Sequence, residues 1–294
     1  MIPSVFATEW ALGNLQSEAY HLTLEQIFGK VRDFGVGHVH LVYRWNFEKE
    51  DVPRIRSLID QYEVQVSCTH SLTRLNRPNS SKEFAAEREQ LKDAIRFAKT
   101  FDSKFVACNY GENLSRDEAT GLRECKREYG DCVALAADEG ITIIVENTCV
   151  ATADEITATA DGVGRLIEAM DSRAFKFHFD PGNMYAAGDE AYPYAYEQLK
   201  GHIAFVHGKD MAKYDERIDL HRRALQAHKQ LERKDGYCVS VPLGTGALNW
   251  EALFAALLRD GYDGFFDIEP HTVQEELDAF YRAGLDYFAQ RTAR

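Results

Sequence analysis

The sequence lacks the patterns that mark membrane proteins and secreted proteins. No stretch approaches the ~18–20 consecutive apolar residues that a membrane span requires. The first residues, MIPSVFATEWALGN, have neither the basic start nor the apolar stretch of a secretory signal. The six cysteines form no C-x-x-C pair, and Cys68, Cys108 and Cys149 lie in or just after apolar runs. These absences predict a soluble, cytoplasmic protein whose thiols are reduced.

Positive charge is scarce and scattered along the chain. The sequence has 34 Lys and Arg residues against 47 Asp and Glu residues, a formal net charge of −13. The longest basic clusters, at 222–223 and 233–234, are short and interspersed with acids. Because nucleic acids and anionic lipid surfaces attract clustered Lys and Arg, we expect neither a nucleic acid nor a membrane as a partner. No G-x-G-x-x-G follows an apolar run either, which disfavours a Rossmann fold.

Short apolar runs alternate with longer amphipathic stretches along the 294 residues. Eight predicted strands and eight predicted helices favour a closed (β/α)8 TIM barrel over an open sheet, built as one α/β domain over residues 1–294. The predicted strands cover residues 4–10, 38–44, 64–71, 104–111, 141–147, 175–182, 203–210 and 264–270. The predicted helices cover residues 22–35, 51–63, 81–102, 116–139, 163–171, 194–201, 248–261 and 273–290.

One segment interrupts this alternation. Residues 211–237 form a polar, charged insertion after the seventh strand, with a possible helix at about 217–231. Long loops on the active face of a barrel are commonly lids or substrate walls, and we expect this role for the insertion.

Four residues with metal-ligand chemistry each follow a short apolar run. They are Glu146 in ITIIVEN, Asp180 in FKFHFDPGN, His207 in IAFVHGKD and Glu269 in GFFDIEPH. The carboxyl ends of barrel strands converge on one face, so these side chains should meet there. An acid at a strand end is alternatively a helix N-cap or a salt-bridge partner. Four such residues on four successive strands favour a metal site over that interpretation.

The expected ligand set is three carboxylates and one imidazole. Oxygen-rich sites suit Mn²⁺, Mg²⁺ or Co²⁺ better than the thiolate-rich sites of structural zinc do. Without a cation, three carboxylates so close together would repel one another strongly. The sequence therefore predicts a bound divalent ion at this face.

The order of these motifs resembles a known family. The chain has Glu146, then DPGN at 180–183, VHGKD at 206–210 and VPLGTGALNWEALFAALLRDGYDGFFDIE at 241–269. This order is similar to that of the sugar phosphate isomerase/epimerase superfamily, whose members share a xylose isomerase-like barrel. The resemblance covers nearly the whole chain and implies that Glu146, Asp180, His207 and Glu269 bind a divalent ion, with the two glutamates also acting as acid and base. Among metals, Mn²⁺ is the first expectation, with Mg²⁺, Co²⁺ or Zn²⁺ as alternatives.

The resemblance also implies a reaction class. Members include ketose 3-epimerases, inosose isomerase and dehydratase, dehydroshikimate dehydratase and the catalytic subunits of C-glycoside deglycosidases. We expect an isomerase or epimerase that removes a proton next to a carbonyl of a sugar, keto sugar or cyclic polyol, through an enediolate. The alternative is a lyase that uses the same glutamates for β-elimination, with a partner subunit if it is a deglycosidase. A metal-stabilised binding protein without catalysis is a third reading, and self-association is expected from the resemblance alone.

Further residues are candidates for substrate contacts. His70 ends the third predicted strand and could bind a substrate hydroxyl or act as an acid, whereas His178 is a weaker candidate of the same kind. Lys209 and Asp210 follow the metal histidine, and Lys209 is alternatively a salt-bridge partner of an acid. Asn183 stands where ketose 3-epimerases carry a substrate-binding histidine. Those enzymes also carry an arginine where this chain has Lys213, so the resemblance does not point to a plain ketose 3-epimerase.

Glycines and aromatic residues complete the candidate pocket. The turn at 244–246, Gly-Thr-Gly, precedes a predicted helix and could hold a phosphate on its backbone N–H groups, or simply form a tight turn. Trp10, Trp45 and Tyr185 are candidates for stacking on a sugar ring, although aromatic residues at helical spacing are more often part of the core.

Overall fold

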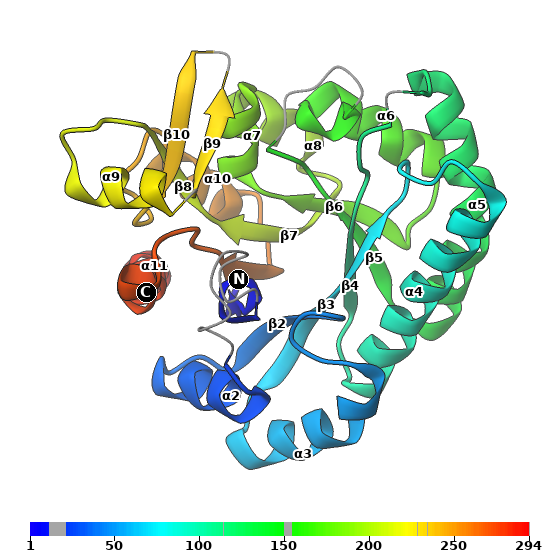
Figure 1. Ribbon diagram of the computed structural model, residues 1–294, viewed down its shortest axis with the longest axis horizontal. Helices are drawn as coiled ribbons and strands as arrows, with labels where there is room; N and C mark the ends of the chain where they lie inside the picture. The colour runs from blue at the N-terminus through cyan, green and yellow to red at the C-terminus, as the bar shows by residue number, and fades with distance from the viewer. Residues whose placement is uncertain (12–21, 114, 150–154, 228, 234, 294) are drawn as a thin grey trace.

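The computed structural model describes residues 1–294 apart from 12–21, 114, 150–154, 228, 234 and 294 (Figure 1). Eight parallel strands close into a barrel in the order β1-β11-β7-β6-β5-β4-β3-β2. This arrangement confirms the predicted TIM barrel. The strands are β1 (Ile2–Phe6), β2 (His38–Val42), β3 (Gln65–Arg74), β4 (Phe105–Asn109), β5 (Thr142–Glu146), β6 (Phe175–Phe179), β7 (Ile203–Gly208) and β11 (Phe265–Ile268).

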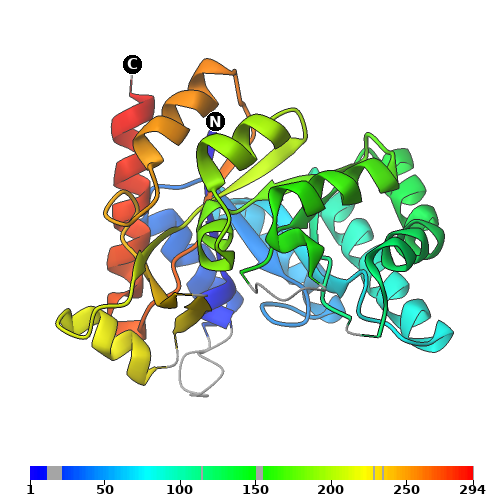
Figure 2. The ribbon, with the colours of Figure 1, turned by 90° about the horizontal axis from the view of Figure 1, so that it is seen from above.

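Helices surround the barrel, and side-chain caps define where several of them begin. Ser80, Asp117, Thr159 and Asn249 each accept a hydrogen bond from a backbone N–H in the first turn. Figure 2 shows the final helix packed along one side of the barrel, where it contacts the first and the last barrel strand. The outer helices are α2 (Leu24–Asp33), α3 (Val52–Tyr62), α4 (Ser81–Thr100), α5 (Glu118–Glu139), α6 (Ala160–Met170), α8 (Tyr196–Leu199), α10 (Trp250–Arg259) and α11 (Leu277–Thr292).

Several short helices lie in the connections. Two of them follow barrel strands directly, at the face where the predicted site should lie: α1 (Thr8–Ala11) after β1, and α7 (Pro181–Ala187) after β6. The others are η2 (Lys49–Asp51), η3 (Ile156–Ala158), η4 (Ala191–Ala195) and η5 (Gln274–Glu276).

The insertion after β7 is a small sheet with one helix. Strands β8 (Asp210–Lys213), β10 (Gly236–Val241) and β9 (Gln230–Arg233) pair antiparallel in that order, and α9 (Asp219–Gln226) precedes β9. The expected helix is therefore shorter than residues 217–231, and the two strands after it were not predicted. They form because Met211 and Cys238 pack with Ala186 of α7, which gives this polar segment an apolar face.

Side chains inside the barrel lie in layers set by the two-residue repeat of a strand. Cys68, Ala107, Ile144 and Phe205 form a small apolar cluster inside the barrel. Each lies two residues before a polar residue of the next layer: His70, Asn109, Glu146 and His207. The apolar layer therefore closes the barrel floor, and the polar layer opens at the carboxyl ends of the strands.

The cysteines and the helices bear on the expectations of reduced thiols and of no membrane span. All six cysteines are free, and five of them are buried. No helix in the described part of the chain has the length and apolar character needed to cross a bilayer.

Candidate metal centre

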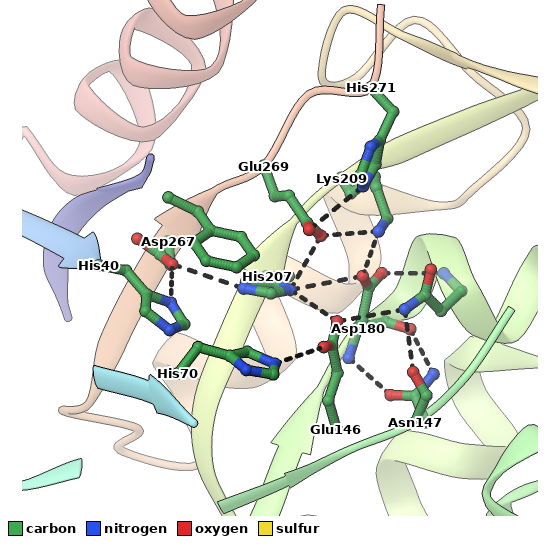
Figure 3. A network of polar contacts seen from close by, with 12 residues as sticks. His40, His70, Glu146, Asn147, Asp180, His207, Lys209, Asp267, Glu269 and His271 are labelled. Carbon is green, nitrogen blue, oxygen red and sulfur yellow. Dashed lines mark hydrogen bonds and ion pairs between the residues drawn. The ribbon is translucent and has the colours of Figure 1, made fainter. Parts of the chain in front are cut away.

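The four predicted ligands lie on adjacent barrel strands. Glu146 ends β5, Asp180 follows β6, His207 lies on β7 and Glu269 follows β11. Each offers one ligand atom, and these atoms all lie within 4.8 Å of one another (Figure 3). The structure therefore brings together residues that are spread over more than 120 positions of the sequence.

The imidazole of His207 stands at the centre of this group. Its Nδ1 lies 3.1 Å from Glu146 Oε1, 3.4 Å from Asp180 Oδ2 and 3.0 Å from Glu269 Oε2. Burial alone would lower the pKa of His207, but the charges of Glu269 and Glu146 raise it well above its ordinary value. Three carboxylates and one imidazole nitrogen facing a common point suit a hard divalent cation, so these residues fit the predicted ion.

A second carboxylate holds the other side of the imidazole. Asp267 Oδ2 lies 3.5 Å from His207 Nε2 and accepts a hydrogen bond of 2.9 Å from His40 Nδ1. Burial opposes the charge, yet the hydrogen bonds with His207 and His40 hold the pKa of Asp267 below its ordinary value. An ionised Asp267 favours a proton on Nε2 and leaves Nδ1 free to bind an ion, as outer-shell carboxylates do in metal sites.

Sequence reasoning missed Asp267 and His40. The available signal was the two-residue repeat: Asp267 lies two positions before Glu269, and therefore points into the barrel from the same strand. By the same rule, His178 points into the barrel, because it lies two positions before Asp180.

Lys209 lies directly among the ligands. Its Nζ is 2.6 Å from Asp180 Oδ2 and 2.7 Å from Glu269 Oε2. Burial disfavours its charge, but Asp180 and Glu269 raise the pKa of Lys209 above its ordinary value. Burial likewise opposes the charge of Glu269, but His207 and Lys209 hold the pKa of Glu269 well below its ordinary value. Glu269 is therefore held in its ionised form.

Two asparagines orient the ligands. Asn183 Nδ2 donates to Glu146 Oε1 at 3.2 Å, and its backbone N–H donates to Asp180 Oδ1 at 2.9 Å. Asn147 forms a reciprocal pair of hydrogen bonds with the backbone of Asp180, at 2.9 and 2.8 Å. Asn183 also lines the pocket, so its predicted place beside the substrate is compatible with this orienting role.

His70 lies at the mouth of the barrel, as predicted, and is a neutral donor. Its Nδ1 accepts the backbone N–H of Leu72 at 3.0 Å, which puts the proton on Nε2, 3.9 Å from Glu146 Oε2. Burial, followed by the positive charges of His40 and His207, lowers the pKa of His70 to about 3. The side chain is therefore a neutral ring near pH 7, and it can donate its Nε2–H as a hydrogen bond.

His178 lies in the barrel interior. Neither ring nitrogen has a hydrogen-bond partner among the described residues, and the ring centroid is 3.9 Å from that of His207. Burial lowers the pKa of His178 well below its ordinary value. Its position beneath the ligands gives it no part in the pocket wall.

A chain of contacts absent from the predictions reaches Glu269 from the other side. His271 Nε2 lies 3.2 Å from Glu269 Oε1, and His271 Nδ1 lies 2.7 Å from Glu9 Oε1. Lys229, from the insertion, contacts Glu9 Oε2 at 2.7 Å. The insertion is thus tied to one of the two candidate catalytic glutamates through Glu9 and His271, residues at opposite ends of the sequence.

Two of the aromatic residues predicted to contact substrate lie away from the pocket. Trp10 is 0% exposed and packs on Tyr281 with ring centroids 4.6 Å apart, so it belongs to the core between barrel and helices. Tyr185 lies under the guanidinium of Arg233, 4.0 Å from its ring centroid, and lines a separate hollow beside α10. Trp45, in contrast, is 42% exposed and lines the pocket at the ligands.

Asp210, another predicted substrate contact, is not part of the pocket lining and binds backbone N–H groups instead. Its buried carboxylate accepts backbone N–H bonds from Met211 at 2.9 Å, Gly244 at 3.0 Å and Gly246 at 2.9 Å. These bonds hold the Gly-Thr-Gly turn against β8 and occupy the N–H groups that a phosphate would need. The turn is therefore structural, and the alternative interpretation of its glycines is the correct one.

A pocket of about 500 Å³ opens above the ligands. Glu146, Glu269 and Lys209 form its floor, with His70, Asn183 and His271 beside them. Trp45, Arg74, Arg77, Asn109 and Cys149 are among the residues of its wall. A pocket of this size accommodates a molecule as large as a monosaccharide.

The fold and the site define a TIM-barrel protein with a buried cluster of carboxylates and histidine at the carboxyl ends of its strands. The model of one family, the xylose isomerase-like TIM barrel, matches residues 28–291, and the chain belongs to this family. This confirms the resemblance seen in the sequence. No curated protein sequence matches the chain.

Solved structures with the same fold are distant in sequence. A D-tagatose 3-epimerase-like protein is 19% identical with a TM-score of 0.76, covering 100% of this chain and 97% of its own. The IOLI protein, in a structure with a bound zinc atom, is 12% identical with a TM-score of 0.76, covering 100% and 98%. The probable 3-DHS dehydratase AsbF from Bacillus anthracis is 14% identical with a TM-score of 0.73, covering 98% and 99%. At these identities the likeness concerns the fold.

Proposed function

We propose that this protein is a divalent-metal-dependent isomerase or epimerase acting on a sugar, keto sugar or cyclic polyol. The observation that carries the proposal is the placement of Glu146 and Glu269, whose carboxylates approach the same imidazole nitrogen from two different strands at the floor of one pocket. The similarity to a D-tagatose 3-epimerase-like protein supports the reaction class. Glu146, Asp180, His207 and Glu269 would hold the ion, with Mn²⁺ as the first candidate.

The reaction begins with removal of a proton next to a carbonyl. When bound, the ion would polarise that carbonyl and lower the barrier to proton loss. Glu269 is ionised and takes the proton as a base, and it later releases this proton to water. Glu146 takes up a proton from water and then returns it to the substrate as an acid. Return to the same carbon inverts its configuration, and return to the neighbouring carbon isomerises the sugar.

Other side chains of the pocket have supporting roles. Lys209 contributes a buried positive charge beside Glu269, and this charge stabilises negative charge that develops on the substrate oxygens. His70 offers the Nε2–H of a neutral ring to a hydroxyl or carbonyl oxygen. Trp45 offers an exposed aromatic face on which a sugar ring can stack.

A lyase is the second candidate. Elimination of a β-substituent starts with the same proton abstraction. The structural similarity to a probable 3-DHS dehydratase supports the lyase as a candidate. His271 lines the pocket 3.2 Å from Glu269, and in this reaction it would donate a proton to the departing hydroxyl. Self-association, and a partner subunit in the case of a deglycosidase, remain expectations.

The test is exchange of substrate protons with solvent. Purified protein loaded with Mn²⁺ is incubated with keto sugars in D₂O, and deuterium incorporation and products are followed by NMR. We expect Glu146→Gln and Glu269→Gln to reduce exchange by about 10²–10⁴-fold, the usual contribution of a general acid or base. Unchanged exchange in both variants, with metal retained, would refute the proposal.

A matched control separates catalysis from charge. Glu168 is exposed on α6 and is not part of the pocket lining. Glu168→Gln removes the same charge and should leave the rate of deuterium exchange unchanged. Metal content measured by mass spectrometry shows whether each variant still binds its ion. The product distinguishes the candidates, since a dehydrated product identifies a lyase.

A further inference from the structure

Two arginines at the pocket wall have no ionic partner. Arg74 ends β3 and Arg77 follows in the next turn, where its backbone N–H donates to Arg74 O at 3.3 Å. Both side chains are exposed and line the pocket. Neither guanidinium makes a hydrogen bond or ion pair with any residue that the structure describes. Most other arginines differ: Arg88 pairs with Glu128, for example, and Arg165 with Glu118.

The backbone places these arginines at a defined distance from the ligands. Arg74 is in register with Asn109 on β4, and Asn109 is in register with Glu146 on β5. Adjacent strands lie about 4.8 Å apart, so the backbones of Arg74 and Glu146 are separated by about 10 Å along the barrel wall. Arg74 therefore lies on the same side of the barrel as Glu146, two strands away.

The stem of Arg74 has little freedom. A Cβ at Gly111 would lie 3.0 Å from Arg74 Cβ and 3.5 Å from its Cγ and Cδ, so the aliphatic stem rests on the backbone of this glycine. Gly111 has a φ of +83°, a conformation that suits glycine and lets the chain pass close to the arginine. The stem of Arg74 is therefore packed against the backbone, while its guanidinium is exposed at the pocket.

The charges of the pocket point the same way. A divalent ion and Lys209 together balance the three carboxylates of the ligand set, so Arg74 and Arg77 add two positive charges that nothing in the wall cancels. Glu87 accepts the backbone N–H of Arg74 at 3.1 Å and feels the charges of both arginines, but it forms no ion pair with either guanidinium. On a chain with a net charge of −13, this local excess of positive charge stands out.

We infer that the substrate carries an anionic group, a carboxylate or a phosphate, that Arg74 and Arg77 bind at the end of the pocket away from the metal ligands. This inference rests on the proposed function and narrows its substrate to a sugar acid or a sugar phosphate. Guanidinium groups match the geometry of both anions, through paired N–H donors. The anion site thus lies after β3, whereas the Gly-Thr-Gly turn after β10 has its N–H groups occupied.

Calorimetry with matched probes tests the inference. Binding to the Mn²⁺-loaded protein is measured for D-glucose against D-glucuronate, and for D-fructose against D-fructose 6-phosphate. We expect at least one charged probe to bind on the order of tenfold more tightly than its neutral counterpart, as expected for a charge-assisted hydrogen bond. A gain with glucuronate identifies a carboxylate substrate, and a gain with fructose 6-phosphate identifies a phosphate substrate.

Variants assign this preference to the two arginines. Arg74→Gln and Arg77→Gln should each reduce it, and the double variant should abolish it. Arg173→Gln is the control, because Arg173 is also exposed and without a partner among the described residues, but lines a different hollow between α6 and α8. The control should bind every probe as the unmodified protein does.

Two results would overturn the inference: charged and neutral probes that bind equally, or a preference that survives the double variant. Failure of the proposed function is recognised separately, through absent Mn²⁺ binding or absent deuterium exchange on a neutral keto sugar. Mn²⁺ binding involves Glu146, Asp180, His207 and Glu269 and neither arginine, so the double variant should retain it.

Discussion

Asp267 should control the metal affinity of the site without touching the ion. It is 0% exposed, accepts a hydrogen bond from His40 and faces Nε2 of His207. The substitution Asp267→Asn keeps the size of the side chain and removes its charge. The amide cannot stabilise a proton on His207 Nε2 as the carboxylate does, so the tautomer that leaves Nδ1 free becomes less favoured.

The expected magnitude follows from the outer-shell position. Substitution of a residue that orients a metal ligand typically lowers metal affinity about 10–100-fold, or about 1.4–2.7 kcal/mol. The upper end is reasonable for Asp267, because it is fully buried and little screened by water. The remaining carboxylates still bind an ion, so affinity should fall without being lost.

Titration with Mn²⁺ by calorimetry, with a chelator in competition, measures this effect. The control is Asp60→Asn, which removes the same charge from an exposed position on α3. Urea unfolding of both variants without metal shows any general loss of stability. A dissociation constant for Asp267→Asn within threefold of the unmodified value would refute the reasoning, and would mean that the contact at 3.5 Å does not orient the ligand.

Two further substitutions test the roles assigned outside the ligand set. Asp210→Ala removes the acceptor of three backbone N–H bonds. It should lower the free energy of unfolding by about 2–4 kcal/mol and leave the Mn²⁺ affinity unchanged. If Asp210 instead served only to bind substrate, the variant would keep its thermal stability. In the metal-free protein, Glu269 and Glu9 outweigh burial and Lys209 and raise the pKa of His271 to about 9. Because the folded pKa exceeds the unfolded value of about 6.5, His271 stabilises the fold fully below pH ~6.5 and loses this effect as the pH rises through about 9. With a ring that is 32% exposed, His271→Gln should cost on the order of 1–2 kcal/mol at pH 6 and much less above pH 9, and an equal loss at both pH values in urea unfolding would contradict this account.

The alternation of strands and helices could be predicted from the sequence. Barrel strands are buried on both faces and form short apolar runs, whereas their helices are buried on one face and form amphipathic stretches. The eight apolar runs therefore predicted the eight barrel strands, and the family model and the closed sheet confirm that fold. The grouping of Glu146, Asp180, His207 and Glu269 was also predictable, because parallel strands bring their carboxyl ends to one face whatever the loops between them.

Tertiary structure alone decided what each remaining polar or aromatic residue contacts. Trp10 and Trp45 both lie at the end of a predicted strand. Trp10 nevertheless belongs to the core and Trp45 lines the pocket, because the packing of the helices determines which ring is covered. Asp210 was expected to contact substrate because it follows the metal histidine closely, but the chain returns 34 residues later and presents its N–H groups to that carboxylate.

The contacts that connect distant segments were equally hidden. Glu9, Lys229 and His271 meet only because the barrel closes β1 against β11 and the insertion folds back over that seam. A sequence encodes local periodicity directly, because each residue's spacing to its neighbours along the chain is visible. It encodes long-range partners only through the packing of the whole chain, and for this protein that packing decided which charges remain unpaired at the mouth of the barrel.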